Sequence, residues 1–185
     1  MEIHLVRHGE TEWSASGRHT SVTDLDLTER GVAQATALRE RLAATPYGLV
    51  LCSPRLRARR TASLAGFDEP VITDDLQEWR YGDYEGLTSE QIREHDPGWT
   101  IWTHPTPGGE SAAQVTARLS RLITRIRESG VERALCFAHG HSLRALALTW
   151  LGVDLRHGDQ FPLHTATLSV LGDDKDQQAL ISWNA

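Results

Sequence analysis

Short apolar runs alternate along this chain with longer segments in which apolar residues recur every three or four positions. The runs have the length and composition of buried strands, and they lie at residues 3–7, 49–52, 71–73 and 134–138. Strands separated by helices indicate βαβ units, in which helices cover both faces of a parallel sheet. The alternation therefore predicts an α/β fold of three layers, α/β/α, with a mostly parallel central sheet.

The intervening segments carry signals of helix starts and of a closing hairpin. Thr28 is a predicted N-cap for a helix through about Ala44, and Ser53-Pro54 is expected to cap and open the next helix. Thr88 begins a capping-box pattern for a short helix. Two further helices and two strands of a closing antiparallel edge are predicted at residues 111–128, 143–151, 167–171 and 179–183, respectively.

The composition of the chain limits the classes of protein to which it can belong. The chain has 185 residues, enough for one domain, and its formal net charge of −6 argues against nucleic acid as the main partner. No apolar stretch approaches the ~18 residues of a membrane span, and the first residues lack a signal-peptide pattern. A cytoplasmic location without membrane contact is expected. Cys52 and Cys136 are interpreted as buried free thiols, with a disulfide between them left open.

Two of the predicted strands end in a histidine that is followed by glycine. The first strand runs into Arg7-His8-Gly9, and the strand at 134–138 runs into His139-Gly140-His141. Ligands of open α/β sheets gather at the carboxyl ends of the strands, so we expect both imidazoles to face one pocket. Arginine presents a rigid fork that suits phosphate, and histidine can attack a transferable group. The pattern favours a phosphate held by Arg7 and attacked by His8.

Two more side chains are candidates for the same pocket. Arg57 belongs to the start of the helix that follows the strand at 49–52, where free backbone N–H groups form a natural anion site. Glu78 lies next to an aromatic segment at 79–84. A carboxyl group among aromatic rings tends to retain its proton, as a general acid requires. Arg57 and Glu78 are therefore a candidate phosphate clamp and a candidate proton donor.

These residues belong to a longer pattern that resembles the histidine phosphatase superfamily, also called phosphoglycerate-mutase-like. The matching stretches are LVRHGET at 5–11, SPRLRA at 53–58, TA at 61–62, EW at 78–79, GDYEG at 82–86, GES at 109–111 and HGH at 139–141. They span nearly the whole chain. An Arg-His-Gly alone is a weak signal, whereas several stretches in the family's order make the resemblance specific.

The resemblance implies a metal-independent phosphatase that needs no cofactor and acts through a phosphohistidine. His8 matches the nucleophile, and Arg7 and Arg57 match the two arginines that clamp the phosphate. His139 matches the second pocket histidine, and Glu78 matches the proton donor to the leaving oxygen. Phosphoryl transfer asks the protein mainly for positioning and charge stabilisation, which fits this set of residues.

The resemblance also suggests which residues contact the rest of the substrate. These candidates are Ser14, His19, Thr20, Tyr81, Gly140 and Arg144. Many family members have asparagine where this chain has Ser14, whose hydroxyl has a shorter reach. The interval from Glu78 to Gly109 is shorter than in the mutase branch, and a shortened lid favours hydrolysis. The chain is therefore expected to be one histidine-phosphatase-like catalytic domain over residues 1–185 that hydrolyses small phosphomonoesters, including sugar phosphates.

The stretches at 53–61, 78–86 and 137–144 are most similar to small acid phosphatases and to sedoheptulose-bisphosphatase-type sugar phosphatases. Two alternatives stay open, a phosphoglycerate mutase and a non-catalytic module that binds phosphorylated ligands. The expected partner is a small phosphorylated metabolite, and the apolar strand pair at 167–183 could also pair across a homodimer.

Two other patterns are weighed and disfavoured. His139 and His141 have the spacing of a metal pair, but the nearby arginines would repel a cation. The arginines at 55, 57, 59 and 60 could form a nucleic-acid patch, but the acidic balance of the chain argues against it. Most of this cluster is interpreted as a solvated helix face.

Overall fold

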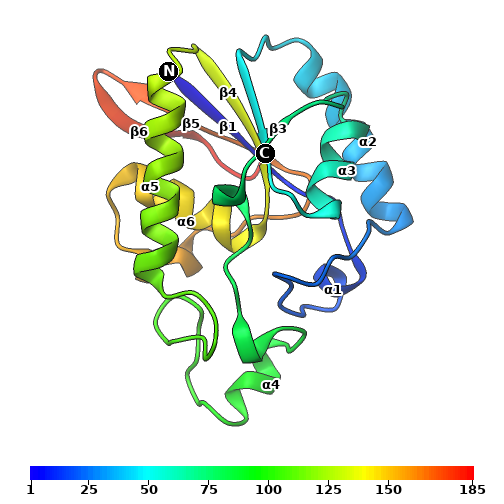
Figure 1. Ribbon diagram of the computed structural model, residues 1–185, viewed down its shortest axis with the longest axis vertical. Coiled ribbons are helices and arrows are strands. Elements are labelled where there is room, and N and C mark those ends of the chain that lie inside the picture. The colour runs from blue at the N-terminus through cyan, green and yellow to red at the C-terminus, as the bar shows by residue number, and fades with distance from the viewer.

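The computed structural model describes residues 1–185, and it contains one six-stranded sheet in the order β3-β2-β4-β1-β5-β6. The strands are β1 (Glu2–Arg7), β2 (Leu49–Cys52), β3 (Val71–Ile72), β4 (Arg133–Ala138), β5 (Leu168–Asp174) and β6 (Gln177–Ser182). Strands β3, β2, β4 and β1 pair in parallel, whereas β5 pairs antiparallel with both β1 and β6. The predicted mostly parallel sheet with an antiparallel edge is confirmed (Figure 1).

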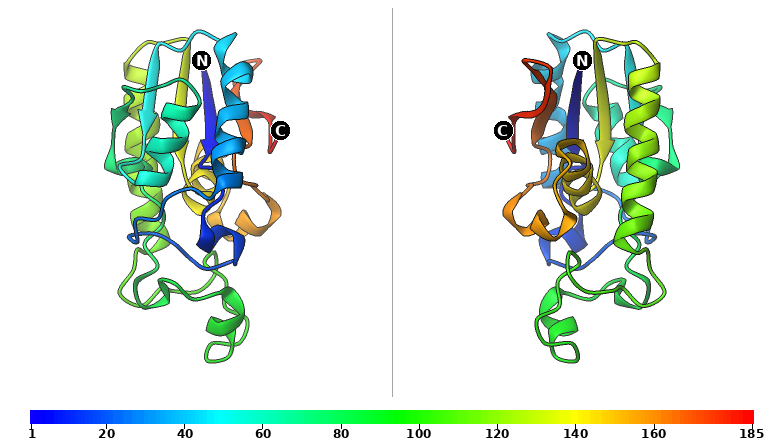
Figure 2. Two further views of the ribbon diagram at one scale, coloured as in Figure 1. Left: turned by 90° about the vertical axis from the view of Figure 1, so that its right-hand side faces the viewer. Right: turned by 90° about the vertical axis from the view of Figure 1, so that its left-hand side faces the viewer.

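Helices cover both faces of this sheet, as Figures 1 and 2 show. One face packs against α5 (Ala112–Glu128) and α6 (Gly140–Leu151), and the other packs against α2 (Glu29–Ala43) and α3 (Leu56–Leu64). Along β4, Ala134 and Cys136 belong to the first core, while Leu135 and Phe137 belong to the second. This alternation confirms the three-layer architecture. None of the helices has both the length and the apolar character that crossing a bilayer requires.

Residues 77–110 form an extension of the domain that includes α4 (Ser89–Arg93), seen at the bottom of Figure 1. Buried indoles anchor it to the core beside α5 and α6, and they belong to Trp79, Trp99 and Trp102. Thr88 and Gln91 form the predicted capping box of α4. A second short helix, α1 (Glu12–Ala15), follows β1.

Two helix starts differ from the prediction. The N-cap of α3 is Arg55, which makes no side-chain cap, so Ser53 and Pro54 precede the helix instead of opening it. The helix predicted from Leu143 begins already at Gly140, because His139 takes the N-cap position and its carbonyl accepts the N–H of Leu143 at 3.1 Å. The polar residues after β2 and β4 therefore lie directly at the sheet edge.

The two cysteines lie on neighbouring strands but on opposite faces of the sheet. The partner of Cys136 is Leu51, and Cys52 is paired with Phe137. Since successive side chains of a strand point to opposite faces, the two thiols point apart. Both are free, and burial raises the pKa of each to about 12.

The register of the parallel strands brings three polar residues together. The N–H groups of His8 and Ser53 donate to the carbonyl oxygens of Ala138 and Phe137, each at 3.0 Å. The first residues beyond β1, β2 and β4 are His8, Ser53 and His139. They are therefore neighbours at the carboxyl edge of the sheet, where the sequence predicts the pocket.

Two glycines let the chain after β1 pass against the first turn of α2. A Cβ atom at Gly9 would lie 2.5 Å from the carbonyl oxygen of Gly31, and one at Gly31 would collide with the carbonyl oxygen of Glu10. Both obstacles are backbone atoms, which cannot rotate away. Glycine is required at both positions, and this contact fixes the direction in which the chain leaves His8.

We expect Gly31→Ala to lower the free energy of unfolding by about 2 kcal/mol, because overpacking a site that cannot relax outweighs the better helix propensity of alanine. Urea denaturation measures the loss. Thr36→Ala, an exposed change on the same helix, is the control and should stay within about 0.5 kcal/mol of the wild type. Equal stability of Gly31→Ala and the wild type would contradict the close approach.

Candidate active site

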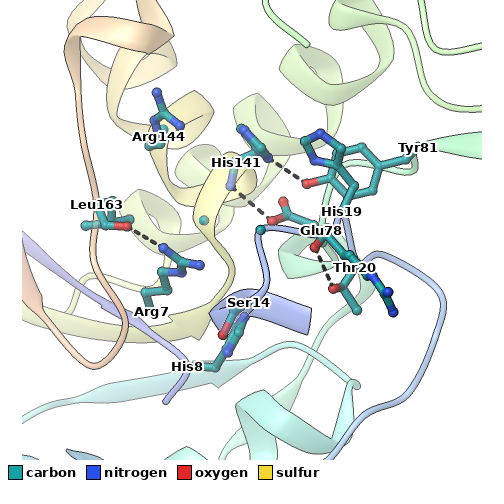
Figure 3. A pocket seen from close by; sticks show the side chains of 13 residues that line it. Arg7, His8, Ser14, His19, Thr20, Glu78, Tyr81, His141, Arg144 and Leu163 are labelled. Atoms are coloured by element: carbon teal, nitrogen blue, oxygen red, sulfur yellow. Dashed lines mark hydrogen bonds between the residues drawn. The ribbon is translucent and has the colours of Figure 1, made fainter. Parts of the chain in front are cut away.

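A cavity of about 150 Å³ opens at the carboxyl edge of β1 and β4 and is lined by 13 residues. In Figure 3, Arg7 and Leu163 lie on one side of it, and His19 and Tyr81 lie on the other. Its wall carries three arginines and three histidines but one carboxyl group, that of Glu78. A water molecule occupies ~30 Å³ in the liquid, so the space suits a phosphate and a small attached group. The charge balance favours an anion.

His8 follows β1 and presents one ring nitrogen to the cavity. Its Nδ1 donates to the carbonyl oxygen of Gly9 at 2.7 Å, which leaves Nε2 without a proton in the neutral ring. The pKa of His8 is held well below its usual value, first by burial and then by the positive charges of Arg57 and Arg7. His8 therefore presents a neutral imidazole with a free lone pair, which is the form a nucleophile needs.

Arg7 lies beside His8 and is half-buried. Nη1 donates to the carbonyl oxygen of Leu163, and Nε has no hydrogen-bond partner (Figure 3). Burial lowers the pKa of Arg7, and the charge of Glu78 opposes this change. A Cβ atom at Gly140 would lie 3.3 Å from Cζ of Arg7, so the absence of a side chain at Gly140 gives the guanidinium room.

His139 and Arg57 lie next to the ring of His8 but just behind the cavity wall. The ring centres of His8 and His139 are 5.3 Å apart. Nε of Arg57 donates to Nδ1 of His139 at 3.1 Å, so Nε2 of His139 carries the proton and donates to the hydroxyl of Ser53 at 2.7 Å. Burial, and next the charge of Arg57, lowers the pKa of His139 well below its usual value. His139 is thus a fixed neutral ring.

Both terminal nitrogens of Arg57 donate to the loop before α2. Nη1 donates to the carbonyl oxygen of Thr23 at 3.0 Å, and Nη2 donates to those of Thr20 and Ser21 at 3.1 and 3.3 Å. Glu85 orders this loop by accepting the N–H groups of Ser21 and Thr23 at 2.8 and 3.0 Å. Arg57 is therefore a buried cation that ties the loop to His139. Its assignment as a direct phosphate clamp stays a prediction.

Glu78 meets the start of α6 with its carboxyl group. Oε2 accepts the N–H of His141 at 3.0 Å, and Oε1 accepts those of Ser142 and Trp79 at 2.7 and 2.9 Å. A helix start has free N–H groups, which explains why an acidic side chain is held there. Each carboxyl oxygen has two acceptor sites, so Oε2 keeps one for a proton or a ligand. The sequence predicts aromatic surroundings for Glu78, but its carboxyl group also accepts three backbone N–H groups.

All six predicted substrate-binding residues line this cavity, namely Ser14, His19, Thr20, Tyr81, Gly140 and Arg144. His19 lies 3.1 Å from the hydroxyl of Ser89, and burial lowers its pKa to about 4. The hydroxyl of Tyr81 lies 2.6 Å from Nδ1 of His141. Burial raises the pKa of Tyr81 and lowers that of His141, each by a large amount. This wall therefore offers neutral hydrogen-bonding groups near neutral pH.

Ser14 and Arg144 already have partners within the protein. The hydroxyl of Ser14 donates to the carbonyl oxygen of Thr11 at 3.0 Å and accepts its N–H at 2.9 Å. Nε of Arg144 donates to the carbonyl oxygen of Gly158 at 3.1 Å, and its guanidinium lies 4.6 Å from the ring centre of Trp102. Ser14 must therefore give up its bond to Thr11 before it can donate to a ligand.

Some functional positions were missed by the sequence interpretation. Ser53 is a predicted helix cap, but its hydroxyl instead accepts a hydrogen bond from Nε2 of His139. His141, weighed only as half of a metal pair, lines the cavity and contacts Tyr81. No three histidine, cysteine or acidic side chains in the structure are grouped to hold a metal ion. The HGH pattern could have indicated His141, but its place in the cavity wall depends on the early start of α6 at Gly140.

Comparisons with known proteins agree on one family. Residues 3–185 match the family model of the histidine phosphatase superfamily (branch 1). An acid phosphatase of Mycobacterium tuberculosis is 43% identical over 91% of this chain and 84% of its own length. A sedoheptulose 1,7-bisphosphatase of Saccharomyces cerevisiae is 38% identical over 82% and 68%. A solved structure of an open reading frame from M. tuberculosis has a TM-score of 0.94 and 40% identity, covering 99% and 96%.

Because buried imidazoles resist protonation, we expect the free energy of unfolding to decrease in acid. The pKa of His19 is about 4 in the folded protein, against 6.5 for an unperturbed histidine, so below pH 6.5 the unfolded chain binds more protons. The free energy of unfolding therefore falls as the pH decreases from 6.5 towards 4. We expect His19→Gln to remove about 2 kcal/mol of this loss at about pH 4.5.

Urea denaturation at about pH 7 and about pH 4.5 measures the difference for each variant. His95→Gln, at an exposed position, is the matched control and should keep the pH dependence of the wild type. A wild-type pH dependence in His19→Gln would contradict the assignment of His19 as a buried neutral ring.

Proposed function

Because this chain belongs to branch 1 of the histidine phosphatase superfamily, we propose that it hydrolyses small phosphomonoesters through a phosphohistidine on Nε2 of His8. The observation that carries the proposal is the free Nε2 of a neutral imidazole in a cavity whose charges favour an anion. Histidine can act as a nucleophile in this form, and no metal ion is required to activate it. In this proposal, residues 1–185 act as one catalytic domain.

In the first step, the ester binds with its phosphate beside Arg7, and Nε2 of His8 attacks phosphorus. The P–N bond forms as the P–O bond to the leaving group breaks. Oε2 of Glu78 has one site left that can hold a proton, and it gives this proton to the leaving oxygen. Nδ1 of His8 keeps its proton on Gly9, and the carbonyl oxygen stabilises the positive charge that develops on the ring.

In the second step, water attacks the phosphohistidine. Glu78 takes a proton from the water as its oxygen binds phosphorus, and the P–N bond breaks. Inorganic phosphate leaves, and His8 returns to the neutral ring. Arg7 lies beside the phosphoryl group throughout, and Arg57 contributes its charge from behind His139. The protein supplies mainly position and charge, as phosphoryl transfer requires.

The substrate class follows from the size and the wall of the cavity. A space of about 150 Å³ admits a phosphate and a few attached atoms, so a larger group must extend past the rim. His19, Tyr81 and His141 offer neutral hydrogen-bonding groups, which suit hydroxyl groups of a sugar. The yeast relative is named as a bisphosphatase of the sugar sedoheptulose, which agrees with substrates of this kind. We therefore propose small phosphate esters, sugar phosphates among them, as substrates.

His8→Ala tests the nucleophile. We expect kcat/KM on p-nitrophenyl phosphate to fall by at least about a thousandfold, since no other group replaces the attacking nitrogen. Quenching with alkaline denaturant during turnover of a ³²P-labelled ester should trap a phosphoprotein in the wild type but not in His8→Ala. His95→Ala is the control and should behave as the wild type. Persistent activity in His8→Ala would contradict the proposal.

The same labelled assay separates the alternatives. A phosphoglycerate mutase would return the label to a phosphoglycerate in the presence of a bisphosphoglycerate primer, whereas a phosphatase releases it as inorganic phosphate. A non-catalytic module would bind phosphate without releasing any from an ester.

Glu78→Gln tests the proton donor through the leaving group. We expect kcat/KM on glycerol phosphate, whose alkoxide leaves poorly, to fall by about 10²–10⁴-fold. The fall should be smaller on p-nitrophenyl phosphate, because nitrophenolate leaves without a proton. Glu128→Gln, an exposed change at the end of α5, is the control. Equal losses on both esters would show that Glu78 does not protonate the leaving oxygen.

A further inference from the structure

One chain segment, 158–166, holds Arg7 at both its backbone and its side chain. The N–H of Ala166 donates to the carbonyl oxygens of Arg7 and His8 at 3.0 and 3.2 Å. The carbonyl oxygen of Leu163 accepts Nη1 of Arg7 (Figure 3). The segment thus fixes where Arg7 lies and how its guanidinium is turned.

The bond to Leu163 decides which edge of the guanidinium is free. Nη1 is occupied, whereas Nε is buried without a partner and Nη2 makes no hydrogen bond within the protein. The N–H groups of Nε and Nη2 point the same way and can bind two oxygens of one phosphate. Turning the guanidinium away from Leu163 would offer the phosphate a different edge. By holding Nη1, the carbonyl oxygen of Leu163 therefore leaves the bidentate edge of Arg7, formed by Nε and Nη2, available to phosphate.

Two residues after β6 hold this segment in turn. The indole Nε1 of Trp183 donates to the carbonyl oxygen of Pro162 at 2.6 Å, and its ring packs edge-on against Phe161 at 5.7 Å. Oδ1 of Asn184 accepts the N–H of His164 at 2.7 Å. These bonds lie directly before and after Leu163. Neither Trp183 nor Asn184 lines the cavity.

We propose that Trp183 and Asn184 are positioning residues for phosphate binding, which act on Arg7 through the carbonyl oxygen of Leu163. The proposal rests on the proposed function, because it takes Arg7 as a phosphate ligand. An interaction that phosphate makes equally in the bound ester and in the transition state changes KM and leaves kcat unchanged. The two residues therefore control the affinity for phosphate.

Trp183→Phe tests the proposal, because it keeps an aromatic ring and removes the indole N–H. We expect the Kd for inorganic phosphate, measured by calorimetry, and the KM for p-nitrophenyl phosphate to rise roughly three- to tenfold, with kcat within about twofold. Trp150→Phe is the matched control, because the indole of Trp150 also donates to a carbonyl oxygen, that of Ala179 at 3.2 Å, away from the cavity. Its Kd and KM should equal those of the wild type.

Two variants at Asn184 test the proposal independently, in case Trp183→Phe does not fold. Asn184 has a φ of +57°, which glycine adopts freely, so Asn184→Gly removes the acceptor without backbone strain. Asn184→Asp retains an acceptor oxygen. We expect the glycine variant to weaken phosphate binding as Trp183→Phe does, and the aspartate variant to stay within about twofold of the wild type.

Three outcomes have distinct meanings. If Trp183→Phe and Asn184→Gly lose thermal stability but keep the Kd for phosphate and the KM of the wild type, their role is structural and the inference is overturned. Equal effects of Trp183→Phe and Trp150→Phe on Kd would overturn it as well. If the wild type neither binds phosphate nor hydrolyses the aryl ester, the proposed function itself fails, and this inference fails with it.

Discussion

The site depends on keeping two guanidinium groups charged inside the protein, beside two imidazoles. Burial lowers the pKa of both Arg7 and Arg57, and Glu78 is the first charge that opposes this for each of them. Carbonyl oxygens of the loop before α2 and of the segment 158–166 also accept hydrogen bonds from these guanidinium groups. A bound phosphate would complete this arrangement, because an unpaired buried charge is costly.

The same positive charges that favour an anion in the cavity also help to keep His8 neutral. Burial lowers the pKa of His8, and the positive charges of Arg57 and Arg7 lower it further. A protonated His8 would bind an anion but could not attack phosphorus, so binding and attack require opposite charge states of a single imidazole. The protein separates the two tasks by placing permanent charge on the arginines and a lone pair on His8. Because its pKa is lowered, His8 keeps its neutral form to more acidic pH than an ordinary histidine.

The mostly parallel sheet and the meeting of His8 with His139 could be predicted, because apolar runs indicate the strands and parallel strands end at the same sheet edge. The surroundings of these residues could not. In the sequence, Ser53 resembles a helix cap. Because α3 begins later, the hydroxyl of Ser53 accepts a hydrogen bond from His139 instead. Backbone carbonyl groups, such as those that hold Arg7 and Arg57, have no signature at all in a sequence. Leu163 reads as an ordinary apolar residue, although its carbonyl oxygen orients Arg7.

The two arginines that the family resemblance assigns to one role differ in the donors they have left. Arg57 spends its Nε on His139 and its two terminal nitrogens on three carbonyl oxygens. Arg7 spends Nη1 alone and keeps Nε unpartnered. In the proposed mechanism, a phosphate would therefore meet the unpartnered Nε–Nη2 edge of Arg7, whereas most N–H groups of Arg57 already donate within the protein. Arg57 is thus the more firmly held of the two arginines, and its bond to Nδ1 keeps the ring of His139 in place.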